Sequence, residues 1–221
     1  MKVLGIDTSL PVGSVSLING NELVASKSWN SPKQHSVSVF KSLQQILGTN
    51  KNRFYEIDLA IFTAGPGSFT GIRIGLSIAK AFKASKKIKK IGTVSTLEAF
   101  SFCFLNSGLP VFVIVEGRKN RYYTYCRDKN RDIFPPEDIP EEDVIDRIKQ
   151  LPGQIIITGN FDLSSSIGKF FKEKENIFVK RTFSSIAICA SLYAKTFGYR
   201  EEIEPIYIRR PDAKPQNKKL G

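Results

Sequence analysis

The chain has few of the residue types on which metal sites and nucleophilic enzymes depend. Its 221 residues include three cysteines and one histidine, His35. The position four residues after His35 is Val39, so no HxxxH pair of metal ligands exists, and a lone histidine at a helix start is expected to be a cap or a surface residue. Cys103, Cys126 and Cys189 have no CxxC spacing, which argues against a structural zinc site and a disulfide framework. We therefore expect no metal site and three reduced, buried thiols.

Long hydrophobic runs are absent as well. Apolar runs such as 111–115 and 155–157 are far shorter than the roughly 20 residues of a membrane span. The opening residues MKVLGIDTS place an acid at Asp7 before the apolar part of a signal peptide could form. No GxSxG nucleophile elbow occurs either. These features predict a cytoplasmic protein that has no contact with a membrane.

Acidic residues are scarce relative to basic ones. The chain has 33 lysines and arginines against 21 acids, a net charge of +12. Between Asp58 and Glu98 there is no acid, whereas seven cations occur there: Arg73, Lys80, Lys83, Lys86, Lys87, Lys89 and Lys90. A polyanion such as tRNA is one candidate partner for this segment. The alternative is a solvated helix end, where lysines interact favourably with the macrodipole, and the sequence leaves both open.

The first half of the chain shows a regular succession of strand and helix patterns. Alternating apolar residues and tight turns predict a three-stranded meander over 2–7, 14–18 and 22–29. Helical spacing follows over 36–47 and ends at Gly48. A strand at 58–63 then leads through a glycine-rich loop into a helix at about 70–84, a strand at 91–94 and a further helix from 96 to 105. Ser95 and Glu98 form a capping box at the start of that last helix.

The second half repeats this order on a smaller scale. It predicts strands at 110–116 and 121–126, acidic proline-bearing loops to residue 140, a helix at 141–150, a strand at 154–158, and helices at 163–171 and 184–197. Two halves that each begin with antiparallel strands and end with parallel βα units indicate an α/β fold of two lobes, each a mixed sheet with flanking helices. We expect residues 1–103 to form the first lobe and 104–221 a smaller second lobe with a basic C-terminal tail.

Two segments at strand ends are candidate anion contacts. Asp7-Thr8-Ser9 offers a carboxylate and two hydroxyls at a turn, although the same residues suit a purely structural turn. The loop GPGSFTG from Gly65 brings backbone amides to a helix N-terminus, where an anion is favoured, but it lacks the lysine of a Walker loop. Its serine and threonine can equally be helix caps. The candidate contacts are Asp7, Ser9, Gly65, Gly67, Ser68 and Thr70.

The helix after this loop has small residues at four-residue intervals. Gly71, Gly75 and Ala79 leave one face nearly bare, so a helix of another chain could approach closely there. Ile72 and Phe82 supply apolar bulk on neighbouring faces. The alternative is that the whole helix packs inside its own lobe.

Four segments carry a resemblance to a known family. IDTSLPVGSVSLI, GPGSFTGIRIGLSIAKAF, GTVSTLEAF and PIYIRR occur in this order across nearly the whole chain. Together they resemble the TsaB family, also called YeaZ, of threonylcarbamoyladenosine biosynthesis. The chain departs from the family where Asp-Ala-Arg often follows the first strand of the second lobe, because it has Glu116-Gly117-Arg118 there.

The resemblance implies a two-lobed actin-like ATPase fold that has lost its adenosine-binding elements, and a non-catalytic scaffold and activator role. Such a subunit pairs with a TsaD-like catalytic subunit, and a TsaE-like ATPase joins the complex. The complex transfers a threonylcarbamoyl group to N6 of the adenosine just 3′ of the anticodon, so tRNA is met through the complex. No cofactor of its own is implied, although ATP could lie at or near the complex interface.

The resemblance also implies that the helices starting near Ser36 and Thr70 form the partner interface. We therefore expect Val39 and Leu43 of the first of these helices to join Gly71, Ile72, Gly75, Ala79 and Phe82 there. An exposed apolar helix face makes a homodimer plausible when the partner is absent.

Two enzyme hypotheses compete with this interpretation. One is an ATP-dependent phosphotransferase or acyl transferase of the same superfamily, using Asp7 and the loop from Gly65 to Gly71. The other is a glycoprotease-like metallopeptidase, which the missing pair of metal ligands disfavours.

Overall fold

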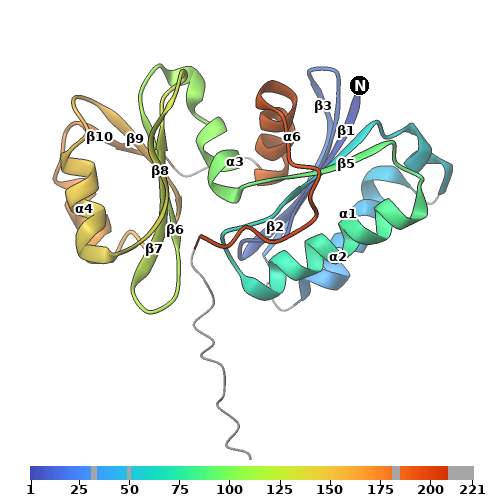
Figure 1. Cartoon of the computed structure of the whole chain (residues 1–221), viewed down its shortest axis with the longest axis horizontal. Coiled ribbons are helices and arrows are strands. Elements are labelled where there is room, and N and C mark those ends of the chain that lie inside the picture. Colours follow the sequence, from blue (N-terminus) through green and yellow to red (C-terminus); the bar gives the residue numbers. More distant parts are fainter. Residues whose placement is uncertain (31–33, 49–50, 181–184, 209–221) are drawn as a thin grey trace, which may run out of the picture.

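The computed structural model describes residues 1–30, 34–48, 51–180 and 185–208, so the predicted basic C-terminal tail lies outside the described residues. These residues form two lobes, each built on a five-stranded sheet (Figure 1). The strands predicted at 2–7, 14–18 and 22–29 and the helix predicted at 36–47 are confirmed as β1, β2, β3 and α1, because their alternating apolar residues and helical spacing match the observed elements.

The sheet of the first lobe has the strand order β3-β2-β1-β4-β5. Its strands are β1 (Lys2–Asp7), β2 (Val12–Asn19), β3 (Glu22–Asn30), β4 (Leu59–Thr63) and β5 (Lys90–Val94). The strands β1, β2 and β3 are antiparallel, whereas β4 and β5 extend the sheet in parallel with β1. The helices α1 (His35–Leu47) and α2 (Phe69–Ser85) cover one face, and the 3₁₀ segment η2 (Lys51–Glu56) connects α1 to β4.

Local sequence explains where two helices of the first lobe begin. Ser68 caps α2, because its hydroxyl accepts a hydrogen bond from the amide of Gly71 at 3.2 Å. The predicted capping box at the start of α3 (Thr96–Phe102) is confirmed: the Ser95 amide donates to Glu98, while the Ser95 hydroxyl accepts from the helix backbone. Because α2 follows β4 and α3 follows β5, both helices start at the C-terminal edge of the parallel strands, where the lobes face one another.

The sheet of the second lobe has the order β10-β9-β6-β7-β8. Its elements are η3 (Leu105–Ser107), β6 (Val111–Glu116), β7 (Arg121–Arg127), β8 (Asp132–Pro140), α4 (Glu141–Lys149), β9 (Ile155–Asn160), α5 (Ser166–Lys172) and β10 (Ile177–Val179). The prediction of loops between β7 and α4 is wrong, because β8 pairs with β7. Pro135 and Pro136 suggested a loop, but β8 is the edge strand, where a missing amide hydrogen costs little.

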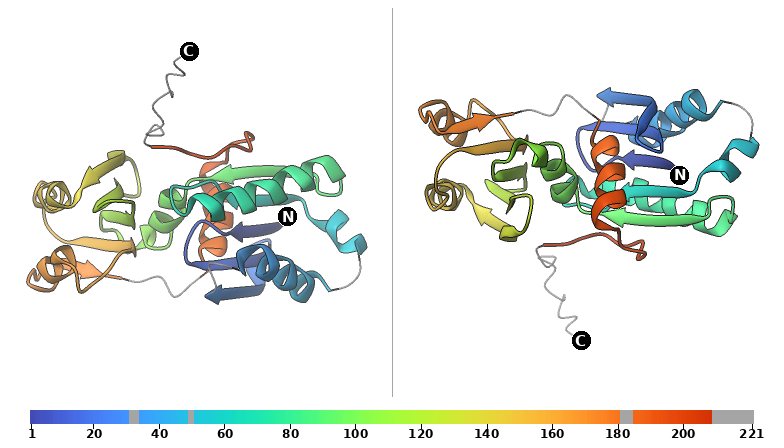
Figure 2. Two further views of the ribbon diagram at one scale, coloured as in Figure 1. Left: turned by 90° about the horizontal axis from the view of Figure 1, so that it is seen from below. Right: turned by 90° about the horizontal axis from the view of Figure 1, so that it is seen from above.

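The predicted division of the chain into 1–103 and 104–221 is also wrong for its last part. The helix α6 (Ile186–Phe197) packs on β1, β2 and β4 of the first sheet. Residues 199–208 then follow the edge of that sheet beside β5 (Figure 2), where Arg200 pairs with Thr93 and the Ile206 amide donates to the Ala64 carbonyl at 2.8 Å. The order of patterns along the chain could not reveal this return to the first lobe.

A shared core joins the two lobes. The helices α3 and α6 lie between the two sheets (Figure 1) and bury apolar side chains of both, including Ile61 of the first sheet and Val113 of the second. A disulfide links Cys103 after α3 to Cys189 of α6, so the prediction of three free thiols is wrong for these two. The packing of α3 on α6 brings together cysteines separated by 86 residues, which spacing could not show. Cys126 is a free, buried thiol.

Arg127 of β7 provides a second tie between the lobes. The residue is only 6% exposed, and its guanidinium carbon lies 4.5 Å from the ring centroid of Phe197 and 5.9 Å from that of Tyr193, both in α6. Phe102 of α3 packs edge-on against both rings. A cation above aromatic rings is stabilised most where water is excluded, so this cluster holds the second sheet against α6.

We expect the substitution Arg127→Ala to lower the free energy of unfolding by about 2 kcal/mol, because it removes the cation–π contacts and the packing of the side-chain stem. Urea unfolding followed by circular dichroism measures this loss. Arg131→Ala is the matched control, since Arg131 is exposed and its loss should change stability by less than about 0.5 kcal/mol. Equal effects of the two substitutions would contradict the assigned role of Arg127.

Candidate functional site

The turn after β1 is organised around Asp7, which is completely buried. Its Oδ1 accepts hydrogen bonds from the Ser9 amide at 2.9 Å, the Ser9 hydroxyl at 2.6 Å and the Thr63 hydroxyl at 2.5 Å. Burial raises the pKa of Asp7 because it disfavours the charged carboxylate, although the three hydrogen bonds oppose this. Asp7 therefore fixes the turn from inside. The prediction that it contacts an anion is wrong, because its carboxylate faces the interior of its own lobe.

The glycine-rich loop packs directly on this turn. The Ser68 amide donates to the Ser9 carbonyl at 2.7 Å, and the Gly71 amide is bound by the Ser68 hydroxyl. Gly67 has a φ of 157°, and a Cβ atom there would collide with the Ser9 carbonyl. Two of the amides expected to hold a phosphate are thus already engaged within the chain. The loop functions first as a close-packed turn between β4 and α2.

A cleft of about 710 Å³ lies between the lobes, beside this loop. Four of the predicted anion contacts line it: Ser9, Gly67, Ser68 and Thr70. Gly65 does not, since it packs against Ile72, and a Cβ there would lie 2.7 Å from Ile72 Cδ1. The structure therefore brings together four of the six predicted residues at one wall of the cleft.

The opposite wall of the cleft comes from the second lobe. The turn between β6 and β7 contributes Arg118 and Lys119, both exposed, and Lys119 has a left-handed backbone with a φ of 58°. Arg121 also lines the cleft, but its guanidinium is paired with Asp138 at 2.6 Å. The exposed Glu116 also lines this wall, so its cations Arg118, Lys119 and Arg121 exceed its two carboxylates by one charge, and the wall could attract an anionic small molecule. In the sequence, Arg118 is conspicuous only within Glu116-Gly117-Arg118, the segment that departs from the family pattern.

The small-residue face of α2 is not available to a partner. Gly71, Gly75 and Ala79 are buried against the turn after β1. A Cβ on Gly71 would overlap the Thr8 carbonyl, and one on Gly75 would lie 2.7 Å from Thr8 Oγ1. The Thr8 hydroxyl donates to the Gly71 carbonyl at 2.7 Å, which locks the helix to the turn.

Three more of the predicted interface residues are core residues of the first lobe. Val39 and Leu43 of α1 are 0% and 3% exposed, and Ile72 is 4% exposed. All three belong to the apolar cluster between the sheet and the helices α1 and α2. The prediction that Val39, Leu43, Gly71, Ile72, Gly75 and Ala79 meet a partner is therefore wrong, because each is already covered by its own lobe.

Phe82 is the predicted interface residue that still reaches the surface. It is half-buried, packs edge-on against Phe54 and Phe62, and lines an apolar groove of about 580 Å³ on the outer side of α1 and α2. The other residues that form this groove are not among the predicted interface residues; they include Ser36 and Phe40 of α1 and Phe69, Arg73, Ile74 and Ala81 of α2.

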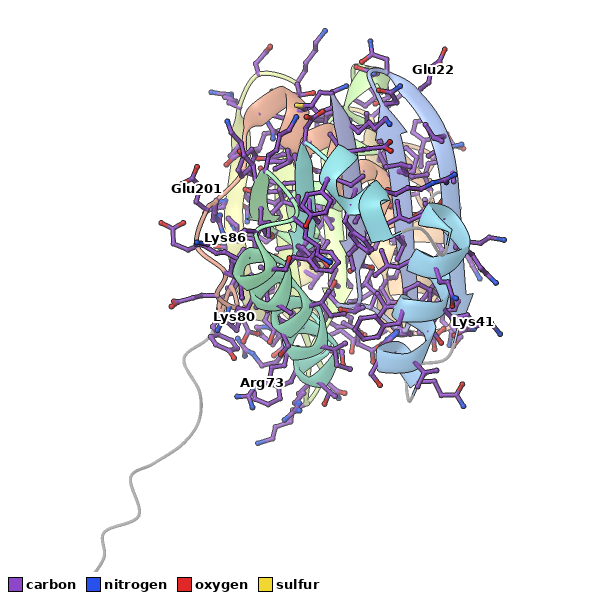
Figure 3. All side chains as sticks on the ribbon, turned by 90° about the vertical axis from the view of Figure 1, so that its right-hand side faces the viewer. Glu22, Lys41, Arg73, Lys80, Lys86 and Glu201 are labelled. Carbon is purple, nitrogen blue, oxygen red and sulfur yellow. A yellow bond between two sulfur atoms is a disulfide. The ribbon has the colours of Figure 1, made fainter. Side chains whose placement is uncertain are left out.

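This groove, which we call the α1–α2 groove, has exposed aromatic walls. Phe40 and Phe69 are 57% and 44% exposed. The Arg73 guanidinium lies 3.8 Å from the Phe69 ring centroid, so the rim is cationic and the floor apolar. Figure 3 shows α1 and α2 side by side, with Arg73 at one end of α2. An apolar depression with exposed aromatic side chains is typical of a protein–protein interface.

His35, predicted to be a cap or a surface residue, is instead 2% exposed. Its Nδ1 accepts a hydrogen bond from Trp29 Nε1 at 2.8 Å. The histidine thus joins the end of β3 to the start of α1. Within residues 1–30, 34–48, 51–180 and 185–208, no group of three or more His, Cys, Asp or Glu side chains is arranged to hold a metal ion. Among the same residues no helix has both the length and the hydropathy to cross a membrane.

The comparisons with known proteins identify the family. A family model described as "TsaD: tRNA N6-adenosine threonylcarbamoyltransferase" matches residues 26–216, which is most of the chain. The chain belongs to this family. Within it the chain is 27% identical to the tRNA threonylcarbamoyladenosine biosynthesis protein TsaB of Escherichia coli, over 95% of each chain. Several further curated relatives carry the same name, so the predicted membership of the TsaB (YeaZ) family is confirmed.

Solved structures of low identity support the fold. YeaZ from Pseudomonas aeruginosa superposes with a TM-score of 0.72 at 18% identity, over 93% of this chain and 99% of that one. The ethanolamine utilization protein EutJ from Carboxydothermus hydrogenoformans gives a TM-score of 0.51 at 12% identity, over 90% of each chain. The predicted two-lobed actin-like fold of this family, with a mixed sheet and flanking helices in each lobe, is confirmed.

Proposed function

We propose that this protein is a non-catalytic subunit in the biosynthesis of tRNA N6-threonylcarbamoyladenosine, acting in the cytoplasm. In this role it binds a TsaD-like catalytic subunit as scaffold and activator, a TsaE-like ATPase joins the complex, and tRNA is met through the complex. The names of the relatives supply the process. The single observation that supports the assignment to a binding subunit is the α1–α2 groove, which is an exposed apolar surface. The glycine-rich loop beside the cleft, in contrast, has amides that are already hydrogen-bonded within the chain.

The arrangement of the first lobe supports a role without catalysis of its own. A phosphotransferase of this fold needs a carboxylate and free amides that face the cleft. Here Asp7 is buried among Ser9 and Thr63, and the Ser68 and Gly71 amides are bonded within the chain. A metallopeptidase needs a cluster of metal ligands, and the described residues offer none.

The α1–α2 groove also leads us to expect that the free protein forms a homodimer. Because its exposed side chains are apolar, a second copy of this chain could cover it when the catalytic subunit is absent. We therefore expect the free protein to form a homodimer that the catalytic subunit displaces. Light scattering of the free chain and of the mixture measures this exchange.

A reconstituted modification assay tests the proposed function. The purified chain is combined with the TsaD-like and TsaE-like proteins of the same organism, threonylcarbamoyl-adenylate as the donor of the transferred group, ATP and unmodified tRNA. We expect the modified nucleoside to form when this chain is present and to fall to background when it is omitted. Equal product with and without the chain, or failure of the chain to co-purify with the catalytic subunit, would overturn the proposal.

A second candidate function rests on the cleft between the lobes. Its volume of about 710 Å³ and the exposed Arg118 and Lys119 would suit a nucleotide, as an ATP-dependent transferase of this fold requires. Calorimetry with ATP, together with ATP hydrolysis by the isolated chain and its Arg118→Ala variant, distinguishes the two functions. Tight binding and turnover that Arg118→Ala removes would favour the transferase. We expect no turnover above background.

A further inference from the structure

The far end of α2 and the neighbouring 3₁₀ segment η2 carry a concentrated positive charge. This lysine surface consists of Tyr55 of η2 and of Lys80, Lys83, Lys86 and Lys87 in and just after the last turns of α2. Lys87 is half-buried and the other four side chains are exposed. Tyr55 is 57% exposed, with the Lys87 ammonium 5.9 Å from its ring centroid.

Two acids close to this surface in the chain are already paired with other lysines. Glu56 is paired with Lys2, and Asp58 with Lys89, each at 2.6 Å. In the part of the chain that the structure describes, Lys80, Lys83 and Lys86 have no carboxylate within ion-pair distance. Charge therefore accumulates here without internal compensation.

The helix macrodipole accounts for only part of this arrangement. Cations are favoured within the last turn of a helix, which covers Lys83 and the cap residue Lys86. Lys80 lies before that turn, and Lys87 lies outside the helix. The exposed aromatic ring of Tyr55 gains nothing from the dipole. A ligand that is both anionic and able to stack accounts for all of these residues together.

The lysine surface is separate from the α1–α2 groove. Figure 3 shows Lys80 and Lys86 on the side of α2 that faces away from α1, with Glu201 of the C-terminal segment beyond them. The groove is lined by other faces of α2, including those of Ile74 and Ala81. A partner could therefore occupy the groove while a second ligand lies on the lysine surface.

We propose that the lysine surface binds the phosphate backbone of RNA, with Tyr55 as a stacking platform for a base. The residues from Lys80 to Lys86 span about 9 Å along the end of α2, a length over which an RNA strand presents two to three phosphates, and Lys87 and Tyr55 extend the surface beyond it. Exposed aromatic rings among cations are typical of RNA-binding surfaces. The identity of the RNA rests on the proposed function, which implies that the bound RNA is the substrate tRNA.

The test replaces Lys80, Lys83, Lys86 and Lys87 with glutamine and measures tRNA binding by fluorescence anisotropy at several salt concentrations. We expect a decrease of about 3 in the slope of log affinity against log salt, and therefore a loss of affinity of about a thousandfold near 0.1 M salt relative to 1 M. The matched control replaces four lysines of the second lobe, Lys129, Lys169, Lys172 and Lys180, and so removes the same charge. We expect the control to retain wild-type affinity within about twofold.

Three results would overturn the inference. They are an unchanged affinity and slope in the first variant, an equal loss in the control, and binding of the wild-type chain to phosphatidylserine vesicles but not to tRNA. The substitution Tyr55→Ala adds a check, since loss of stacking should weaken binding at all salt concentrations and leave the slope unchanged.

Measurements on the assembled complex separate this inference from the proposed function. If the lysine variant assembles with the catalytic subunit and tRNA affinity is unchanged, the proposed RNA site is wrong and the proposed function stands. If the wild-type chain does not assemble but binds tRNA through these lysines, the proposed function falls and the RNA site stands.

Discussion

The substitution Gly71→Ala is expected to lower the free energy of unfolding by about 3 kcal/mol. The added Cβ would overlap the backbone carbonyl of Thr8, and a backbone atom in the β1–β2 turn cannot move aside without disturbing the hydrogen bonds of Asp7 and Ser9. Helix propensity alone would instead predict a gain of about 1 kcal/mol for alanine over glycine. The sign of the measured change in urea unfolding therefore distinguishes a buried contact from an open helix face.

Ser77→Ala serves as the control for this prediction. Ser77 is an exposed residue of the same helix, so its replacement should change stability by less than about 0.5 kcal/mol. A Gly71→Ala protein as stable as the wild type would mean that α2 does not pack on the Thr8 turn. The substitution Gly75→Leu should likewise lower stability rather than partner binding, because a side chain at this position would collide with Thr8.

The substitution Phe40→Asp is expected to weaken binding of the TsaD-like subunit by about 2–3 kcal/mol, or roughly 30- to 150-fold in Kd. Phe40 forms part of the α1–α2 groove and is 57% exposed, so a charge there would be buried by the partner without costing the free protein much stability. Isothermal titration calorimetry with the purified catalytic subunit measures the loss, and circular dichroism verifies the fold.

Leu23→Asp is the matched control for the groove. Leu23 lies at the start of β3, is 52% exposed and does not line the groove. Its replacement removes a similar apolar side chain from the same lobe and should leave affinity within about threefold. Wild-type affinity in the Phe40 variant, or equal losses in both variants, would show that the partner binds elsewhere.

Much of the fold could be predicted because its signals are local. Alternation in β1 and β2, the stop at Gly48, and the capping box of Ser95 and Glu98 each depend on residues close together in the chain. The strand β8 was missed because prolines at an edge resemble a loop in sequence. The disulfide and the return of α6 to the first lobe were missed because both depend on contacts between residues far apart in the chain.

The candidate site was predicted less well, and α2 shows why. The interval of four between Gly71, Gly75 and Ala79 correctly indicates that something approaches this face closely. Periodicity cannot say whether that neighbour is another chain or a turn of the same chain. Similarly, Phe40 fits the helical spacing of the core residues Leu43 and Leu47, yet it lies in the groove.

The sequence by itself determined the family, the order of most strands and helices, and the excess of positive charge near the end of α2. These properties depend on motifs, periodicity and composition, which can be read from the order of residues alone. Only the tertiary structure decided that the glycine face of α2 is closed by Thr8, that Asp7 points inward, and that Phe40 and Phe69 form the exposed surface. The physical reason is that burial depends on which distant segment covers a side chain, and local spacing does not encode that choice.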